Sequence, residues 1–364
     1  MLFRSLHTLL DASAGWPAIS SRLASAARNL QARFAWTELI AWLGLTDILG
    51  KLAGEQALPD RRVALTARGD ALLTLGATGP ALISYRAALV VDERLAALHP
   101  EAVGPLRNLS IDHNNIGDVL SAQGDLPRAL AAFRAAMDIS ARLAAADTGN
   151  AEWQRDLSVS HNKIGDALSA QGDLPRALDA FRAAMDIRAR LAAADTGNAQ
   201  WQRDLSVSHN KIGEVLRAQG DLPRALDAFR AAMDIRVRLA AADTGNAQWQ
   251  RDLSFSYERI GIVSRAQGDF PGALDAYRAG LEIDERLALH APDNAQVQRD
   301  LFISLREVAR LAAVTGDCTS ARTVAARTEV QAHLLVEQFP HIPQHISDLT
   351  SVKALRQEID TACP

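Results

Sequence analysis

Three histidines recur at a spacing that raises the possibility of a metal centre. His113, His161 and His209 follow one another at intervals of 48 residues, and imidazole is a common zinc ligand. We expect them on successive parallel helices, whose axes lie roughly 8–10 Å apart, whereas each ligand atom lies about 2 Å from a bound zinc. Equivalent positions on such helices point in parallel instead of converging. The spacing therefore predicts a packing or polar structural role for these histidines and no metal site.

Sequence signatures of catalysis are also missing. The chain contains no Gly-rich phosphate loop with Lys, no paired-His zinc motif, no Gly-x-Ser-x-Gly elbow and no Cys-x-x-Cys. Ser158, Ser206 and Ser254 recur, but the repeat places no base beside them. We therefore expect a protein without enzymatic activity and without a cofactor.

The recurring histidines and serines belong to a long internal repeat. Residues 201–248 repeat residues 153–200 with changes at only four positions, and the turn Gln-Gly-Asp recurs every 48 residues. A fixed period of this kind is the signature of a repeat architecture. The units begin near Arg62, Ser110, Ser158, Ser206, Ser254 and Phe302, and a seventh half-unit begins near Asp348.

Each unit has the pattern of two helices. Residues from Trp201 to Val215 that face one side recur at spacings of three and four, which is the helical period. Gly220 then ends the first helix and Asp221 starts the second, with Pro223 in the first turn, where its missing N–H costs nothing. Two helices of about 20 residues and two short turns account for the period. The sequence therefore predicts an all-α fold.

Small and large residues within a unit resemble those of the tetratricopeptide repeat, in its lengthened bacterial form. The resemblance is carried by Gly165, Leu168, Ala177, Phe181 and Ala184, and it extends from about Arg62 to the C-terminus. It implies a right-handed superhelical solenoid of antiparallel helix pairs. It also implies a non-catalytic scaffold that binds proteins or peptides.

The resemblance further implies that the first helices line a concave groove. The residues that it places there are Asn114, Asp118, Asn162, Asp166, Asn210, Glu214 and Arg217, followed by Glu258, Arg265, Arg306 and Arg310. This row is acidic at first and basic later, so it could orient an extended peptide by charge complementarity. The alternative is that Lys163 and Lys211 pair with the carboxylates within or between units.

Composition restricts the class of partner and the compartment. The 364 residues carry a net charge of −4 with an isoelectric point near 6.1, which is not the basic character that nucleic-acid binding requires. Cys318 and Cys363 are too few for a disulfide framework, and such low cysteine content is typical of a reducing compartment. We therefore expect a cytoplasmic protein that does not bind nucleic acid, and the resemblance implies that its partner is another protein or a peptide.

Residues 1–57 lie outside the repeat. Leu58-Pro59-Asp60 marks the boundary, so we expect an N-terminal helical segment, then a solenoid over 58–364 with six helix pairs and a C-terminal capping helix. The apolar run around Trp36 and Trp42 is interrupted by acidic residues and is too short to span a membrane. The segment could cap the first repeat, expose tryptophan for docking or dimerisation, or be the remnant of a larger effector domain.

Two functional interpretations follow. The first is a non-catalytic interaction scaffold that binds a partner protein or peptide in its concave groove. The second is the regulatory or sensor array of a signalling enzyme (an ATPase, protease or kinase) whose catalytic domain is missing or separately encoded. The oligomeric state is left open by the sequence. Because few positions differ between neighbouring units, few positions can distinguish one partner from another.

Overall fold

The structure is a computed structural model that describes residues 16–32 and 35–364. Over that range the secondary structure is helical and contains no strand. The elements are α2 (Trp16–Ala32), α3 (Trp36–Ala53), the short 3-10 helix η1 (Gly54–Ala57), α4 (Leu58–Thr74), α5 (Thr78–Leu98), α6 (Val103–Ala122), α7 (Leu126–Ala146), α8 (Ala151–Ala170), α9 (Leu174–Ala194), α10 (Ala199–Ala218), α11 (Leu222–Ala242), α12 (Ala247–Ala266), α13 (Phe270–His290), α14 (Ala295–Val314), α15 (Cys318–Gln338) and α16 (Pro343–Ala362). None of these described helices combines the length and the apolar composition that a membrane crossing requires.

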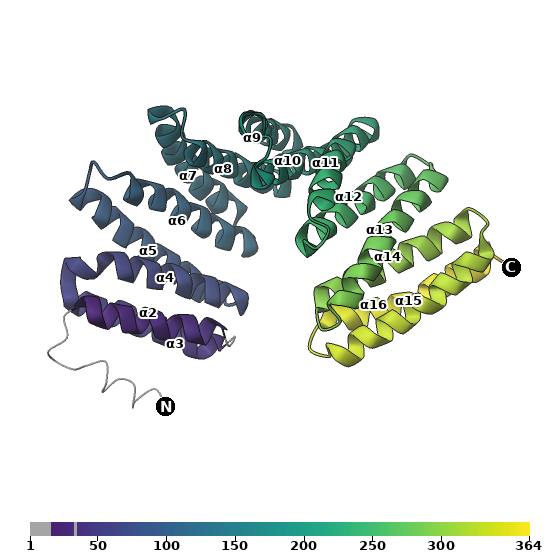
Figure 1. The fold of residues 1–364 in the computed structure, drawn as a ribbon, viewed down its shortest axis with the longest axis horizontal. Helices are drawn as coiled ribbons and strands as arrows, with labels where there is room; N and C mark the ends of the chain where they lie inside the picture. Colours follow the sequence, from purple (N-terminus) through teal and green to yellow (C-terminus); the bar gives the residue numbers. More distant parts are fainter. Residues whose placement is uncertain (1–15, 33–34) are drawn as a thin grey trace. The chain divides into compact units, whose positions relative to one another are not determined.

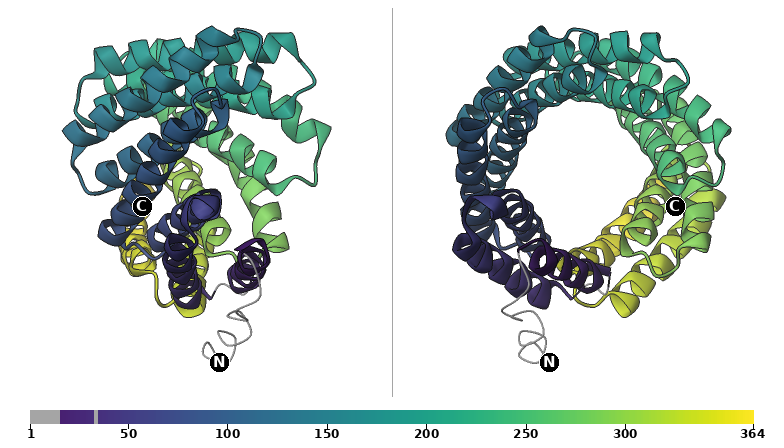
Figure 2. Two further views of the ribbon diagram at one scale, coloured as in Figure 1. Left: turned by 90° about the vertical axis from the view of Figure 1, so that its left-hand side faces the viewer. Right: turned by 60° about the vertical axis from the view of Figure 1, so that its left-hand side comes forward.

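The helices form two compact units, Met1–Ile187 and Arg188–Pro364, with the boundary inside α9. Within each unit, helices that follow one another along the chain pack side by side as antiparallel pairs, as Figure 1 shows. The views of Figure 2 show the same neighbour-to-neighbour packing from other directions. The all-α solenoid of helix pairs is therefore confirmed. The division at residues 57 and 58 stays a prediction, and residues 1–15 of that segment lie outside the described part of the chain.

The turn inside each pair uses a glycine stop followed by an aspartate start. Gly220 has a φ of 82°, in the left-handed region that favours glycine. The amide of Asp221 donates to the carbonyl of Leu216 at 2.9 Å, and its carboxylate accepts from the amide of Arg224 at 3.2 Å. The predicted stop and start signals are therefore confirmed. The same arrangement occurs at Gly124-Asp125, Gly268-Asp269 and Gly316-Asp317.

A glycine and an aromatic ring set the close approach of the two helices in a pair. A Cβ atom at Gly165 would lie only 2.6 Å from Cε1 of Phe181, and Phe181 itself is buried. Only a residue without a side chain leaves room for the ring at this crossing. The same contact joins Gly117 to Phe133 and Gly213 to Phe229. This packing explains the small and aromatic pattern that carries the family resemblance.

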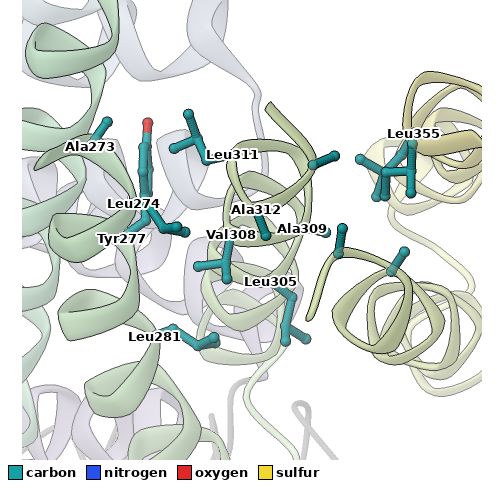
Figure 3. Packing of buried hydrophobic residues seen from close by; sticks show 14 of the residues in the cluster. Ala273, Leu274, Tyr277, Leu281, Leu305, Val308, Ala309, Leu311, Ala312 and Leu355 are labelled. Atoms are coloured by element: carbon teal, nitrogen blue, oxygen red, sulfur yellow. The ribbon is translucent and has the colours of Figure 1, made fainter. Parts of the chain in front are cut away.

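The pair α14 and α15 departs from this pattern. Ala309 stands at the position of the earlier glycines and Ala325 at the position of the aromatic residues, and both are buried. Figure 3 shows Val308 of α14 on the side that faces α13, with Leu355 of α16 on the other side of α14. The α16 helix thus completes the core at the C-terminal end of this unit.

The two cysteines correct an expectation from the sequence. Cys318 at the start of α15 and Cys363 just after α16 form a disulfide, with their Cα atoms 5.5 Å apart. The low cysteine number predicts no disulfide framework and favours a reducing compartment, but it carries no information on whether two cysteines lie close together. The folding of α16 back onto α15 brings together two residues that are 45 positions apart.

The burial of the N-terminal tryptophans bears on the interpretation in which residues 1–57 expose tryptophan for docking. Trp42 is only 5% exposed, and its indole N–H donates to the carbonyl of Leu23 at 2.9 Å. Trp16 is buried as well, and its indole donates to Asp60 at 2.7 Å. The interpretation in which α3 exposes Trp42 for docking is therefore wrong, because α2 folds over this ring. Trp36 is partly buried in the same region.

Candidate functional site

The predicted groove residues lie on α6, α8, α10, α12 and α14, which we call the first helices of their units. On α6 and α8, Nζ of Lys163 lies 2.7 Å from Oδ1 of Asp118, so an ion pair joins two successive 48-residue repeats. Asp166 and Lys211 each interact with another residue too. The alternative of pairing between units therefore applies to Asp118, although a paired and half-exposed carboxylate still contributes to the local field.

The predicted asparagines contribute little accessible surface. Asn162 is 8% exposed and Asn210 is 7% exposed. Asn114 is partly buried, and its side-chain oxygen is shielded from solvent. Helical periodicity placed these residues on the correct helix, but it did not show how deeply packing buries them. A partner in the groove would contact the charged side chains more than these amides.

The predicted basic end of the row is an ion cluster around one acid. Glu307 on α14 is buried and pairs with Arg265 at 2.7 Å, with Arg306 at 3.0 Å and with Arg310 at 2.9 Å. Arg310 also reaches Glu358 on α16 at 2.7 Å. The structure therefore brings the three predicted arginines together. Sequence reasoning missed both glutamates, because the repeat alone did not show which helix faces would meet.

A second cluster joins α10 to α12. Glu214 pairs with Arg217 on its own helix at 2.9 Å and with Arg259 on α12 at 2.9 Å. The guanidinium of Arg259 also lies 4.2 Å from the ring centroid of Phe255, a cation–π contact. Arg259 and Phe255 were not among the predicted site residues. The available signal was that Phe255 replaces the valine found at Val207, one period earlier.

A cavity of about 550 Å³ opens beside this cluster. It lies wholly within residues 188–364, and the first helices α10, α12 and α14 provide most of its lining. The helix that follows each first helix in its repeat is called the second helix. Two residues of second helices also line the cavity, Arg236 of α11 and Asp284 of α13. Charged side chains of both signs and the ring of Phe255 therefore surround one space.

The two second-helix residues are buried charges held by hydroxyl groups. Arg236 is 4% exposed and donates to the hydroxyls of Ser206 at 3.2 Å and Ser256 at 2.9 Å. Burial lowers the pKa of Arg236 to about 10. Asp284 accepts from the hydroxyls of Ser254 and Ser304, both at 2.6 Å, and burial raises its pKa. The recurring serines thus satisfy buried charges between units, a role that the sequence did not show.

The recurring histidines are half-buried on α6, α8 and α10. Burial lowers the pKa of His113, His161 and His209, which favours neutral imidazoles near pH 7. In the described part of the chain, no group of three or more His, Cys, Asp or Glu side chains is arranged to hold a metal ion.

Comparison with known proteins identifies the repeat. Residues 114–147, 160–195 and 208–243 match the family model described as the tetratricopeptide repeat. These three segments are tetratricopeptide repeats. Each matched segment begins in a first helix that carries a predicted groove residue and ends near the end of the following helix. No curated protein matches the sequence.

Solved structures share the tetratricopeptide fold at low sequence identity. BtubC (BKLC) from P. vanneervenii is 15% identical over 69% of this chain and 89% of its own length, with a TM-score of 0.55. The apo form of the quorum sensor NprR from B. thuringiensis is 11% identical over 97% of this chain and 92% of its own length, also with a TM-score of 0.55. At these identities the likeness concerns the fold alone. Tetratricopeptide folds are typical of protein-interaction scaffolds and are generally non-enzymatic.

Proposed function

We propose that this protein is a non-catalytic scaffold whose first-helix groove binds a segment of a partner protein. The observation that carries the proposal is the cavity of about 550 Å³ on the first-helix side of residues 188–364, surrounded by charged residues. Charged side chains also follow the first helices of residues 1–187, where Asp118 and Lys163 bridge α6 and α8. Complementary charge gives a bound segment its register and its specificity.

A charge swap separates binding from structural pairing. The variant Asp118→Lys breaks the ion pair with Lys163, whereas the double variant Asp118→Lys/Lys163→Asp restores a pair of opposite direction. We expect the double variant to keep the melting temperature of the wild type. The amount of partner that it captures should fall on the order of tenfold. The measurement is affinity capture from lysate of the source cells, with mass spectrometry of the captured proteins.

The matched control is Asp179→Lys on the outer side of α9, where the aspartate side chain is 77% exposed. This control makes the same change of charge as the single variant Asp118→Lys, but outside the groove, and should capture the partner as well as the wild type does. Equal capture by the charge swap would contradict groove binding and would leave the pair with a structural role only. If the captured partner is an ATPase, protease or kinase, the regulatory interpretation replaces the simple scaffold.

A further inference from the structure

The unit from Ser254 to Leu301 differs from the preceding unit at positions that converge on one cavity. Units of equal length give each residue an equivalent 48 positions earlier. The relevant replacements are Phe255 for Val207, Glu258 for Asn210, Arg259 for Lys211 and Asp284 for Arg236. All four replacing residues line the cavity described above. In an array of similar units, the positions that differ are the ones that can distinguish a particular partner.

The basic residues that line the cavity already have partners. Arg251 donates to Asp300 at 2.6 Å, and Arg259 pairs with Glu214 at 2.9 Å. Arg236 donates to serine hydroxyls and also to the backbone carbonyl of Asp252 at 2.9 Å. Lys211 interacts with another residue as well. The basic side chains of the cavity therefore make their hydrogen bonds and ion pairs within the protein itself.

The acidic residue Glu258 is different. This half-buried side chain on α12 lines the cavity and makes no hydrogen bond or ion pair with the described residues. Burial raises the pKa of Glu258; the nearby Arg259 opposes this rise, and Asp300, Asp284 and Glu307 add to it. Asp284, in the same cavity, is held by two neutral hydroxyls instead of a cation. Glu258 is therefore an acidic side chain of the cavity without an ion-pair partner among the described residues, and a cationic ligand would supply one.

We propose that this cavity binds a lysine or arginine side chain of the partner segment, with the Glu258 carboxylate as its counter-ion. The inference rests on the function proposed above and adds the chemistry of the residue that is recognised. The methylene stem of such a side chain can pack on the exposed part of the Phe255 ring while its charged end reaches the carboxylate. A hydrogen bond between two charged groups is stronger than a neutral one. The replacements in this repeat provide both the Glu258 carboxylate and the Phe255 ring.

The first test uses a library of acetylated and amidated peptides that share random flanks and carry lysine, arginine, glutamate or norleucine at the centre. We expect the wild-type full chain to enrich the lysine and arginine peptides. The variant Glu258→Asn should reduce this enrichment on the order of tenfold. Asparagine is the residue at Asn114, Asn162 and Asn210, so the fold accepts it at this position of the repeat. The control Glu282→Asn removes an exposed acid from α13 and should leave enrichment unchanged.

A second measurement does not depend on a peptide partner. Nα-acetyl-arginine amide is titrated at millimolar concentration into protein with 13C-labelled glutamate carboxyl groups, and the Glu258 signal is identified by its loss in Glu258→Asn. We expect this probe to shift the Glu258 signal and to bind more tightly as pH rises through the raised pKa of Glu258, because only the carboxylate pairs with a cation.

The two measurements separate the two proposals. Binding of the arginine amide without binding of any peptide would support the cation site and count against the scaffold function. Peptide binding without a basic preference, or a preference that survives Glu258→Asn, would overturn the cation site and leave the scaffold in place. Enrichment of glutamate peptides would also overturn it and would point to Arg236 and Arg259 instead.

Discussion

At the scale of single residues, two buried carboxyl groups lie between α5 and α6. Asp92 accepts from Arg62 at 3.0 Å and from Asn108 at 3.3 Å. Asp112 is fully buried nearby, and both of its carboxyl oxygens are shielded from solvent. Burial and the neighbouring Asp92 raise the pKa of Asp112 to about 8, against the opposing charge of Arg62. Near pH 7 the site therefore favours a neutral Asp112.

This pair predicts a pH dependence of stability. The unfolded Asp112 loses its proton near pH 3.8, whereas the folded one keeps it up to about pH 8. The free energy of unfolding should therefore decrease as pH rises through this window. Replacing Asp112 by the serine found at Ser160 and Ser208 should flatten the dependence and raise the melting temperature at pH 8. Thermal melts from pH 5 to pH 9 test this.

The control for this titration is Asp138→Ser, which removes an exposed aspartate from α7. Its melting profile should follow that of the wild type. Identical profiles for Asp112→Ser and the wild type would contradict a buried, protonated Asp112. Serine is the informative replacement because neighbouring units already bury it at this position of the repeat.

At the scale of helices, the contact between a glycine and an aromatic ring determines how closely two helices of a pair approach. A Cβ atom at Gly165 would overlap the ring of Phe181, and the ring has no room to move because it is buried. We expect Gly165→Ala to destabilise the protein by about 1–3 kcal/mol, the usual cost of overpacking a core. Denaturant unfolding monitored by circular dichroism measures this change.

The matched control is Gly104→Ala in α6. A Cβ atom at Gly104 meets nothing within 4 Å, so this substitution makes the same chemical change without overlap. It should leave stability unchanged or raise it slightly, since alanine is the better helix former. Equal effects of the two substitutions would mean that helix propensity, and not the approach of the helices, determines the role of Gly165.

At the scale of the whole molecule, each part of a solenoid is stabilised mainly by its neighbours along the chain. The disulfide between Cys318 and Cys363 closes a segment whose ends are 45 residues apart, and chain-entropy treatments assign such a closure about 4 kcal/mol. Reduction should therefore speed amide hydrogen exchange in α15 and α16 and leave α6 and α7 unchanged. Exchange measured by mass spectrometry with and without reductant tests this.

The double variant Cys318→Ser/Cys363→Ser provides the control for reduction. Its exchange pattern should match that of the reduced wild type and should not respond to reductant. Faster exchange throughout the chain after reduction would contradict local stabilisation. No change in α15 and α16 would mean that packing of Leu355 and Ile359 holds α16 without the disulfide.

The sequence alone determined the features that repeat. Its period of 48 residues, the turn at Gly220-Asp221 and the pairing of Gly165 with Phe181 all depend on residues close in the chain. The ion pair between Asp118 and Lys163 could be anticipated for the same reason, because equivalent helices in successive units must be neighbours. Local periodicity and nearest-neighbour packing contain enough information for these features.

Only the tertiary structure decided the features that depend on how helix faces meet. The burial of Trp42 beneath α2, the disulfide of Cys363 and the convergence of three arginines on Glu307 each join side chains whose spacing does not indicate contact. The cavity around Glu258 is of the same kind, since three first helices and two second helices contribute to it. Periodicity determines which helix carries a residue, but side-chain direction and burial depend on the packing of neighbouring helices.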